Sequence, residues 1–177
     1  MPTTYTRKDD FEDHLTRYLS ALESGPDEVD PETARTIGLI LGMFGAVEIY
    51  VPKALSRLSG IPLEDAKAIV GAFRAFSNKI GLIEEFISQR GGTPETKIAS
   101  YVKGRFNDAN KIRNLYAHGI YRWYGELLID PYGDRNRTKL LKMVDLKNDL
   151  ETMRRISLEM NSIYDLGQIP PALFAQL

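Results

Sequence analysis

Apolar residues in the first part of the chain recur at three- and four-residue steps, which is the spacing of helices that bury one face. In residues 11–22 this stripe consists of Phe11, Leu15, Tyr18, Leu19 and Leu22. The run Asp30-Pro31-Glu32 then supplies an N-cap, a proline for the first helical position and an acid for the first turn. It predicts a helix to about Tyr50. Pro52 has no backbone N–H to donate, so we expect a kink or break there.

Two longer helices are predicted next, over residues 63–89 and 96–118. The first would turn one set of apolar side chains inward: Ile69, Phe73, Phe76, Ile80, Ile83 and Phe86 or Ile87. Gly91-Gly92 ends it, and Thr93-Pro94-Glu95 repeats the signal of cap, proline and acid. Gly119 follows the last residue of the second helix, where glycine commonly ends a helix.

The period changes after residue 120. Aromatic and branched residues in 121–129 and 138–144 flank a turn signal at 130–134, which predicts a two-stranded hairpin over about 121–144. Asp145 is placed to cap a last helix to residue 166, and residues 168–177 form a short tail. One face of this helix carries Leu146, Leu150, Met153 and Met160. The pattern predicts one domain, 1–177, of mainly α class: a compact bundle of about five helices with a small β-hairpin before the last helix.

The amino-acid composition argues against several classes of functional site. The chain has 177 residues, of which 43% are hydrophobic and 27% charged, which is typical of a folded domain. It has no cysteine and two histidines, His14 and His118, so we expect no transition-metal site and no cofactor. The first 13 residues lack the apolar core of a signal peptide, and we expect a cytoplasmic protein that binds no membrane.

The most apolar run, residues 37–51, contains Gly38, Gly42 and Gly45. Small residues at such spacing can form a packing face between membrane helices. The run is shorter than the ~20 residues that span a bilayer, and it includes Glu48. We therefore expect the glycines to let another helix of a soluble bundle approach closely.

The helix over 96–118 carries the clearest functional signal. Its apolar stripe consists of Ile98, Val102, Ala109, Ile112 and Tyr116. Successive residues turn by ~100°, which aligns a second, polar stripe: Asn107, Lys111, Asn114 and His118. Arg113, Asn114 and His118 therefore form a cluster at the helix end, with Asn110 one turn before it.

The segment Arg113-Asn114-Leu115-Tyr116-Ala117-His118-Gly119 resembles the signature of the HEPN superfamily, in which an arginine precedes a histidine by four to six intervening residues. An asparagine directly after the arginine is typical of the family. The resemblance implies a helical, generally dimeric protein. Many members are metal-independent ribonucleases in toxin, antiviral or RNA-processing systems, and others are non-catalytic and bind ligands, RNA or partners.

One departure bears on regulation. Some members that are paired with nucleotidyltransferase antitoxins carry a tyrosine two residues after the histidine. Here that position is Ile120, and Tyr121 comes one residue later. This departure argues against that toxin–antitoxin subfamily and its control by modification, although the resemblance still allows a protein regulator or antitoxin.

Metal-free cleavage of RNA requires a base for the 2′-hydroxyl proton, charge stabilisation at phosphorus and an acid for the leaving oxygen. We predict that His118 acts as base or acid and that Arg113 binds the phosphate, while Asn114 orients the imidazole or the substrate. One imidazole does not supply both proton transfers. We therefore expect a homodimer that brings two copies of the helix end into one cleft.

Charge is uneven along the chain. The first 35 residues contain nine acidic and four basic residues, whereas residues 97–122 contain six basic residues and one acidic residue. Basic and aromatic residues together suit single-stranded RNA. Candidate binding residues in this segment are Asn110, Lys111, Lys103 and Tyr121.

A structural role for the cluster stays open, because Arg113 could pair with an acid such as Glu48 and His118 could interact with the helix dipole. We expect Glu48 to pair with a cation or to support the Arg113 cluster. The sequence thus predicts a HEPN-like, RNA-directed protein, acting as a metal-independent endoribonuclease. The alternative is a non-catalytic HEPN-like module that binds RNA or a protein partner.

Overall fold

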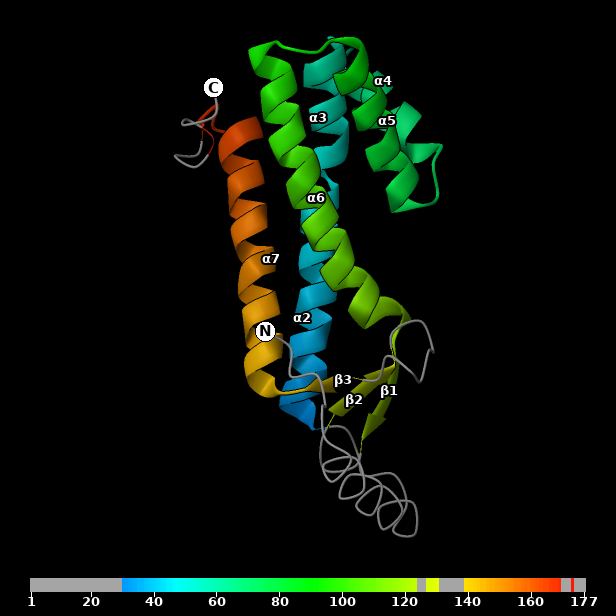
Figure 1. Cartoon of the computed structure of the whole chain (residues 1–177), viewed down its shortest axis with the longest axis vertical. Coiled ribbons are helices and arrows are strands. Elements are labelled where there is room, and N and C mark those ends of the chain that lie inside the picture. The colour runs from blue at the N-terminus through cyan, green and yellow to red at the C-terminus, as the bar shows by residue number, and fades with distance from the viewer. Residues whose placement is uncertain (1–29, 124–126, 131–138, 170–172, 174–177) are drawn as a thin grey trace.

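A computed structural model describes residues 30–123, 127–130, 139–169 and 173. The fold is mainly α, as predicted, with six helices and three short strands in the part of the chain described (Figure 1). The helices are α2 (Pro31–Glu48), α3 (Tyr50–Ser59), α4 (Leu63–Gly71), α5 (Phe76–Gln89), α6 (Pro94–His118) and α7 (Met143–Tyr164). The strands are β1 (Ile120–Trp123), β2 (Leu127–Asp130) and β3 (Lys139–Leu141). The helix predicted over residues 11–22 lies outside the described residues.

Two helix starts follow the predicted caps. Asp30 Oδ2 accepts hydrogen bonds from the backbone N–H of Thr33 at 2.9 Å and from its hydroxyl at 3.0 Å. Thr93 Oγ1 accepts from the backbone N–H of Thr96 at 3.2 Å. A side-chain acceptor at this position satisfies an N–H that has no partner within the helix. Helix α2 therefore begins where predicted, and α6 begins directly after its predicted cap, at Pro94, two residues before the predicted residue 96.

The break predicted near Pro52 lies at Ile49, between α2 and α3. Pro52 falls in the first turn of α3, where an N–H would have no helical partner in any case. Because proline cannot donate to the carbonyl of Glu48 four residues earlier, one continuous helix would lose a hydrogen bond there. The break therefore precedes the proline rather than coinciding with it.

The single helix predicted over residues 63–89 is wrong: α4 ends at Gly71 and α5 begins at Phe76. The inward direction is confirmed for Ile80 and Ile83, which are buried, whereas Ile69 is exposed. The break brings Phe76 against two other helices, with its ring centroid 4.8 Å from that of Phe44 and 6.2 Å from that of Phe106. This aromatic contact stabilises the separate direction of α5.

The predicted hairpin before the last helix is present and has a third strand. The order is β1-β2-β3, with antiparallel pairing throughout. Tyr121 lies opposite Ile129, and Ile129 lies opposite Lys139. The chain therefore reverses between β1 and β2, within the run predicted as one strand, and Gly125 in that connection is the available sequence signal. The turn predicted at residues 131–134 and the end of the tail lie outside the described residues.

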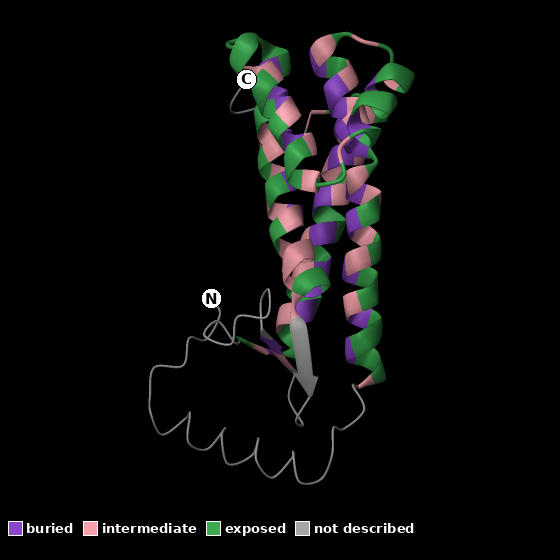
Figure 2. Ribbon diagram, turned by 90° about the vertical axis from the view of Figure 1, so that its right-hand side faces the viewer, coloured by how far each residue is buried: buried purple, intermediate pink, exposed green. Residues whose placement is uncertain are grey.

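The core runs along the helices where they face one another, as Figure 2 shows by the placement of buried residues. Helix α2 packs against α6 and α7, and α5 packs against α6. The predicted inner face of the last helix is confirmed, because Leu146, Leu150, Met153 and Met160 are buried. Asp145 is not the N-cap, since α7 begins two residues earlier. Its carboxylate accepts from the backbone N–H of Lys142 at 3.1 Å, which is the interaction that the N3 residue makes in a capping box.

Helices α2 and α3 form the most apolar stretch of the described chain. Together, Pro31–Ser59, they are 29 residues long, with a window of mean hydropathy 1.5, and pass by length and composition as a membrane-spanning candidate. One third of that window is buried inside the protein. Core helices of soluble proteins pass the same test, so this feature is weak evidence for a membrane.

Candidate functional site

Buried side chains and a hydrogen bond to α7 hold α6 against the core. Val102, Phe106 and Ala109 are fully buried, which fixes the helix against the core. Near the helix end, the buried Tyr116 donates a hydrogen bond from its hydroxyl to Asp149 Oδ2 of α7 at 2.7 Å. The pKa of Asp149 is raised, chiefly because burial disfavours the carboxylate, and the hydrogen bond from Tyr116 opposes that shift. This side of α6 is structural, and it turns Arg113 and Asn114 toward the partly open side.

Arg113, Asn114 and His118 form one hydrogen-bonded cluster, hereafter the Arg113 cluster. Arg113 Nη1 lies 2.6 Å from His118 Nε2 and donates to Asn114 Oδ1 at 2.9 Å. A guanidinium has only donors, so His118 Nε2 must be the acceptor in this arrangement. The structure brings together the three residues that the sequence predicts as catalytic.

An aromatic ring from α2 supports the cluster. Arg113 Cζ lies 5.7 Å from the ring centroid of Phe44, which is itself buried. A guanidinium at this distance from a ring face is attracted by a cation–π interaction. Sequence reasoning missed Phe44, because its position in an apolar run predicts only a core residue.

Gly119 lets the sheet approach the end of α6. A Cβ added to Gly119 would lie 2.3 Å from Ile129 Cδ1 and 2.6 Å from the carbonyl oxygen of Leu115. Ile129 belongs to β2 and is fully buried. The glycine therefore holds β2 against the helix end directly after His118, and no larger residue fits there without movement.

No described hydrogen bond or ion pair joins Lys103, Lys111 or Asn110 to the Arg113 cluster. Lys103 pairs with Glu84 of α5 at 2.7 Å, and Lys111 pairs with Asp108 at 3.6 Å. Asn110 is half-buried, one turn before Arg113 and Asn114. Tyr121 is placed by its backbone in β1, and its side chain lies outside the description.

Glu48 pairs with a cation, as predicted, and that cation is Lys79, at 2.7 Å. Among the described residues no hydrogen bond or ion pair joins Glu48 to the Arg113 cluster, so the supporting role suggested for it stays a prediction. Within the described residues, no carboxylate lies within salt-bridge distance of Arg113. The partners of Arg113 in this part of the chain are an imidazole, an amide and an aromatic ring.

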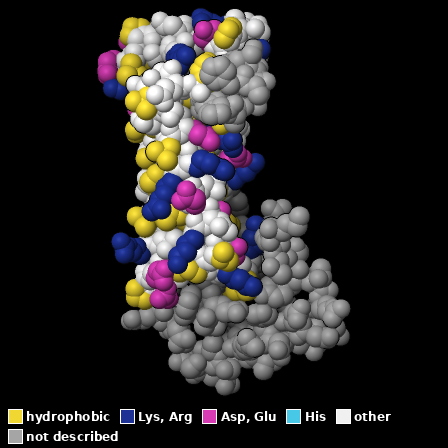
Figure 3. All heavy atoms as spheres, turned by 90° about the vertical axis from the view of Figure 1, so that its left-hand side faces the viewer, with side chains coloured by type: hydrophobic (Ala, Val, Ile, Leu, Met, Phe, Trp, Pro, Cys, Tyr) yellow, Lys and Arg dark blue, Asp and Glu magenta, His cyan; other side chains and the backbone are white. Residues whose placement is uncertain are grey.

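Several cations of the basic segment, residues 97–122, form ion pairs with acids. Arg105 Nε lies 3.0 Å from Glu159 Oε2 of α7, which also accepts a hydrogen bond from Tyr101 at 3.0 Å. Lys103, Arg105 and Lys111 therefore have carboxylate partners, and the net charge of the segment overstates its basic surface. Figure 3 shows acidic, basic and apolar side chains interspersed on the α7 side of the molecule. On that face the described residues form no continuous basic strip.

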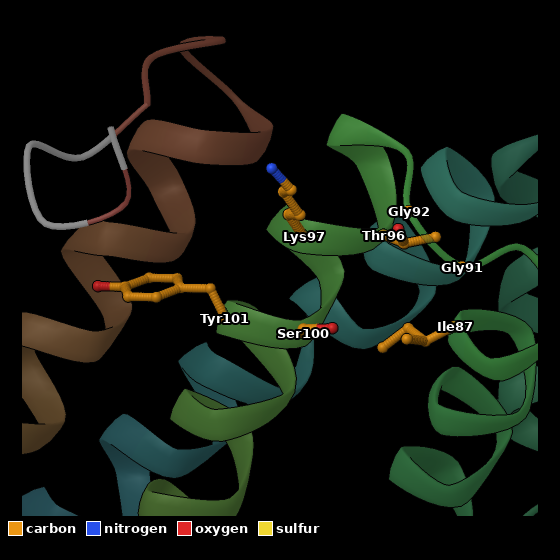
Figure 4. Close-up of a pocket in the computed structure, with 7 residues that line it drawn as sticks. All are labelled: Ile87, Gly91, Gly92, Thr96, Lys97, Ser100 and Tyr101. Carbon is orange, nitrogen blue, oxygen red and sulfur yellow. The ribbon is translucent and has the colours of Figure 1, made fainter. Parts of the chain in front are cut away.

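A separate hollow of about 430 Å³ lies at the other end of α6 (Figure 4). It is open to solvent and is lined by Ile87, Gly91, Gly92, Thr96, Lys97, Ser100 and Tyr101. Thr96 and Arg113 are 17 residues apart on one helix, which is about 25 Å along its axis. The hollow therefore contains none of the predicted site residues.

Comparisons with protein-family models, with curated proteins and with solved structures find no match for this chain.

Proposed function

We propose that the protein is a HEPN-like, metal-independent endoribonuclease that works as a homodimer, with the Arg113 cluster as its active site. The observation that carries the proposal is the set of partners of Arg113: among the described residues its side chain contacts an imidazole, an amide oxygen and an aromatic ring, and no carboxylate, near an accessible helix end. A carboxylate partner would compete with a phosphate for the guanidinium. Within the described residues no acid offsets its charge, which leaves the guanidinium available to an anion.

Substrate binding would exchange one hydrogen bond for another. In the free protein, Arg113 donates to His118 Nε2. When the guanidinium turns to a phosphate, it releases the Nε2 lone pair, which then accepts the proton of the 2′-hydroxyl. Arg113 stabilises the charge that grows on the phosphate oxygens. Asn114 is placed to hold either group during the exchange, because it accepts from the guanidinium in the free protein.

The balanced reaction needs a second proton carrier. The 2′-oxygen forms a bond to phosphorus while the bond from phosphorus to the 5′-oxygen breaks, and the leaving oxygen takes up a proton. The products are a 2′,3′-cyclic phosphate and a 5′-hydroxyl. His118 of a second copy, in its protonated form, would supply that proton, and this requirement is the reason for proposing a dimer.

The test is incubation of the purified protein with mixed single-stranded RNAs in EDTA, followed by analysis of the ends. We expect cleavage that leaves 2′,3′-cyclic phosphates and that is lost in His118→Ala and Arg113→Ala proteins with unchanged circular dichroism. Arg154→Ala is a matched control, because it removes an exposed arginine that pairs with Glu151 on α7. Binding without cleavage would support the non-catalytic module instead.

The dimer is tested by dilution. If the second proton comes from a second copy, the cleavage rate per chain falls when the protein is diluted below its dimer dissociation constant, measured by analytical ultracentrifugation. A monomeric protein with full activity would contradict this part of the proposal.

A further inference from the structure

Helix α6 ends without the backbone hydrogen bond that closes the other described helices. After α2, α3, α4, α5 and α7, the next residue donates its backbone N–H to the carbonyl four residues earlier. Gly119, the residue after α6, is extended (φ −74°, ψ 143°), and it donates no such bond to a described residue. The last four carbonyls of a helix have no partner within it, so this end depends on tertiary contacts for its order.

Two tertiary contacts hold the end of α6. The hydroxyl of the buried Tyr116 donates a hydrogen bond to Asp149 Oδ2 of α7 at 2.7 Å. Gly119 lies against the buried Ile129 of β2, where the helix meets the three-stranded sheet (Figure 1). The first contact involves a titratable carboxyl and the second is apolar, so of the two only the first responds to pH.

His118 is the predicted site residue that depends most on this end. It is the last residue of α6, whereas Arg113 lies five residues earlier, where the helix continues on both sides. The two side chains meet with 2.6 Å between Arg113 Nη1 and His118 Nε2. If the last turn opens, His118 moves while Arg113 stays on the helix, and this contact is lost.

Asp149 is a titratable group where α6, α7 and β3 meet. Among the described residues it faces Tyr116 from α6, Lys139 from β3 and Asp145 from its own helix. Burial raises the pKa of Asp149 and Asp145 adds to that rise, while the hydrogen bond from Tyr116 and the charge of Lys139 oppose it. A hydrogen bond to a carboxylate is stronger than one to the neutral acid, so protonation of Asp149 weakens its contact with Tyr116.

We propose that Asp149 is a positioning residue for His118: its carboxylate holds the last turn of α6 through Tyr116, and it holds that turn less firmly once it is protonated. The Arg113 cluster therefore loses order on acidification through a group outside the cluster. The consequence for RNA cleavage rests on the proposed function, whereas the effect on the helix end does not.

Amide hydrogen exchange in the full-length protein, measured by NMR without RNA, tests the order of the helix end. The ¹³C signal of the Asp149 carboxyl gives the pH at which this group titrates. Exchange rates divided by those of an unstructured peptide at the same pH give protection factors. As the pH falls through the Asp149 midpoint, we expect the protection of residues 115–118 to drop about 5-fold relative to that of Val102, which is fully buried earlier in α6.

Variants separate Asp149 from His118, because a histidine also changes charge in this range of pH. Asp149→Asn keeps the shape of the side chain and removes the charge, and Tyr116→Phe keeps the buried ring and removes the donor. Both should show the low protection at every pH. Glu151→Gln removes an exposed carboxylate of α7 and should behave as wild type. A pH-dependent drop that persists in Asp149→Asn, or wild-type protection that stays constant through the Asp149 midpoint, would overturn the proposal.

Cleavage kinetics test the consequence for the reaction. At pH 7, Asp149→Asn should lower kcat about 3- to 10-fold and leave KM within about 2-fold, because the base is misplaced while Arg113 still binds the phosphate. Glu151→Gln should change neither value. Wild-type kcat in Asp149→Asn would overturn the positioning role in catalysis. If the wild-type protein cleaves no RNA, the ribonuclease proposal fails, and the exchange experiment still decides whether Asp149 positions His118.

Discussion

The two halves of α6 hold their arginines in opposite ways. In the first half, Arg105 is bound to the carboxylates of Glu159 and Asp108 and to the hydroxyl of Tyr101, which ties α6 to α7. At the end of the helix, Arg113 contacts an imidazole, an amide oxygen and an aromatic ring. Among the described residues, carboxylates thus neutralise Arg105, and none neutralises Arg113.

This difference separates structural cations from one that can bind a ligand. To bind a phosphate, Arg105 would have to leave the carboxylates of Glu159 and Asp108. Breaking these partly buried ion pairs would lower the stability of the protein. Turning Arg113 away from His118 and Asn114 separates it from no carboxylate among the described residues. A count of basic residues along the sequence cannot make this distinction, because it does not show which of them face acids.

The largest expected effect concerns the shape of the guanidinium. Arg113→Lys keeps the charge but loses the planar fork that binds a phosphate through two hydrogen bonds, so the cleavage rate should fall by about 10- to 100-fold. Arg105→Lys should leave cleavage within about 2-fold at temperatures where the protein is folded. Initial rates on one fluorescent RNA give both values. Equal losses of cleavage rate in the two variants would contradict the proposed difference between Arg113 and Arg105.

Gly119→Ala tests whether the sheet fixes the end of the cluster. An added methyl group would overlap Ile129 of β2 and the carbonyl of Leu115 in α6 itself, so relief requires that both β2 and the backbone at the end of α6 shift. We expect unfolding by urea to show a loss of about 2–3 kcal/mol. An unchanged midpoint for Gly119→Ala would show that the sheet is not held in place there.

Arg105→Ala tests the structural half of the comparison. Loss of the guanidinium removes the contacts with Glu159 and Asp108 and leaves Glu159, which is mostly buried, without its cation. We expect a loss of about 1–2 kcal/mol in the free energy of unfolding. Lys67→Ala is the control, because its pair with Glu64 is exposed and should contribute almost nothing. Equal effects of the two changes would contradict a structural role for Arg105.

The smallest effect depends on pH. The folded protein raises the pKa of Asp149, so its native state binds the proton more tightly than the unfolded chain does. Stability from this group is therefore present below its ordinary pKa and falls as the pH rises through the raised value. Tyr116 stabilises the carboxylate form, so Tyr116→Phe should cost about 1 kcal/mol at pH 7 and less near pH 4. Urea unfolding at both pH values measures it, and an equal cost at both would contradict this account.

Local signals in the sequence predict the helix starts well. Asp30 and Thr93 cap α2 and α6 by accepting hydrogen bonds from residues three positions later. These interactions are local in sequence, so the sequence alone predicts them. The break between α4 and α5 has no comparable signal. It depends on the contact of Phe76 with Phe44, and these residues are joined by packing rather than by proximity along the chain.

The same division applies to the candidate site. Rotation by ~100° per residue is enough to place Asn114 and His118 on one side of a helix, and the motif adds Arg113. The ring of Phe44 beneath the guanidinium and the carboxylates that bind Lys103 and Lys79 come from other helices. Tertiary contacts of this kind decide which charges are available, and one sequence does not reveal them.

The central claim is that the Arg113 cluster cleaves RNA through the 2′-hydroxyl. The most direct measurement compares wild-type protein and the His118→Ala variant on one RNA in EDTA, beside the same RNA with 2′-deoxyribose at the cleaved position. The account predicts a 2′,3′-cyclic phosphate from wild-type protein on the all-ribose RNA only, and a loss of about 10²–10⁴-fold in the variant. Cleavage that survives either the deoxyribose or the His118→Ala change, or intact RNA with folded wild-type dimer, would contradict it.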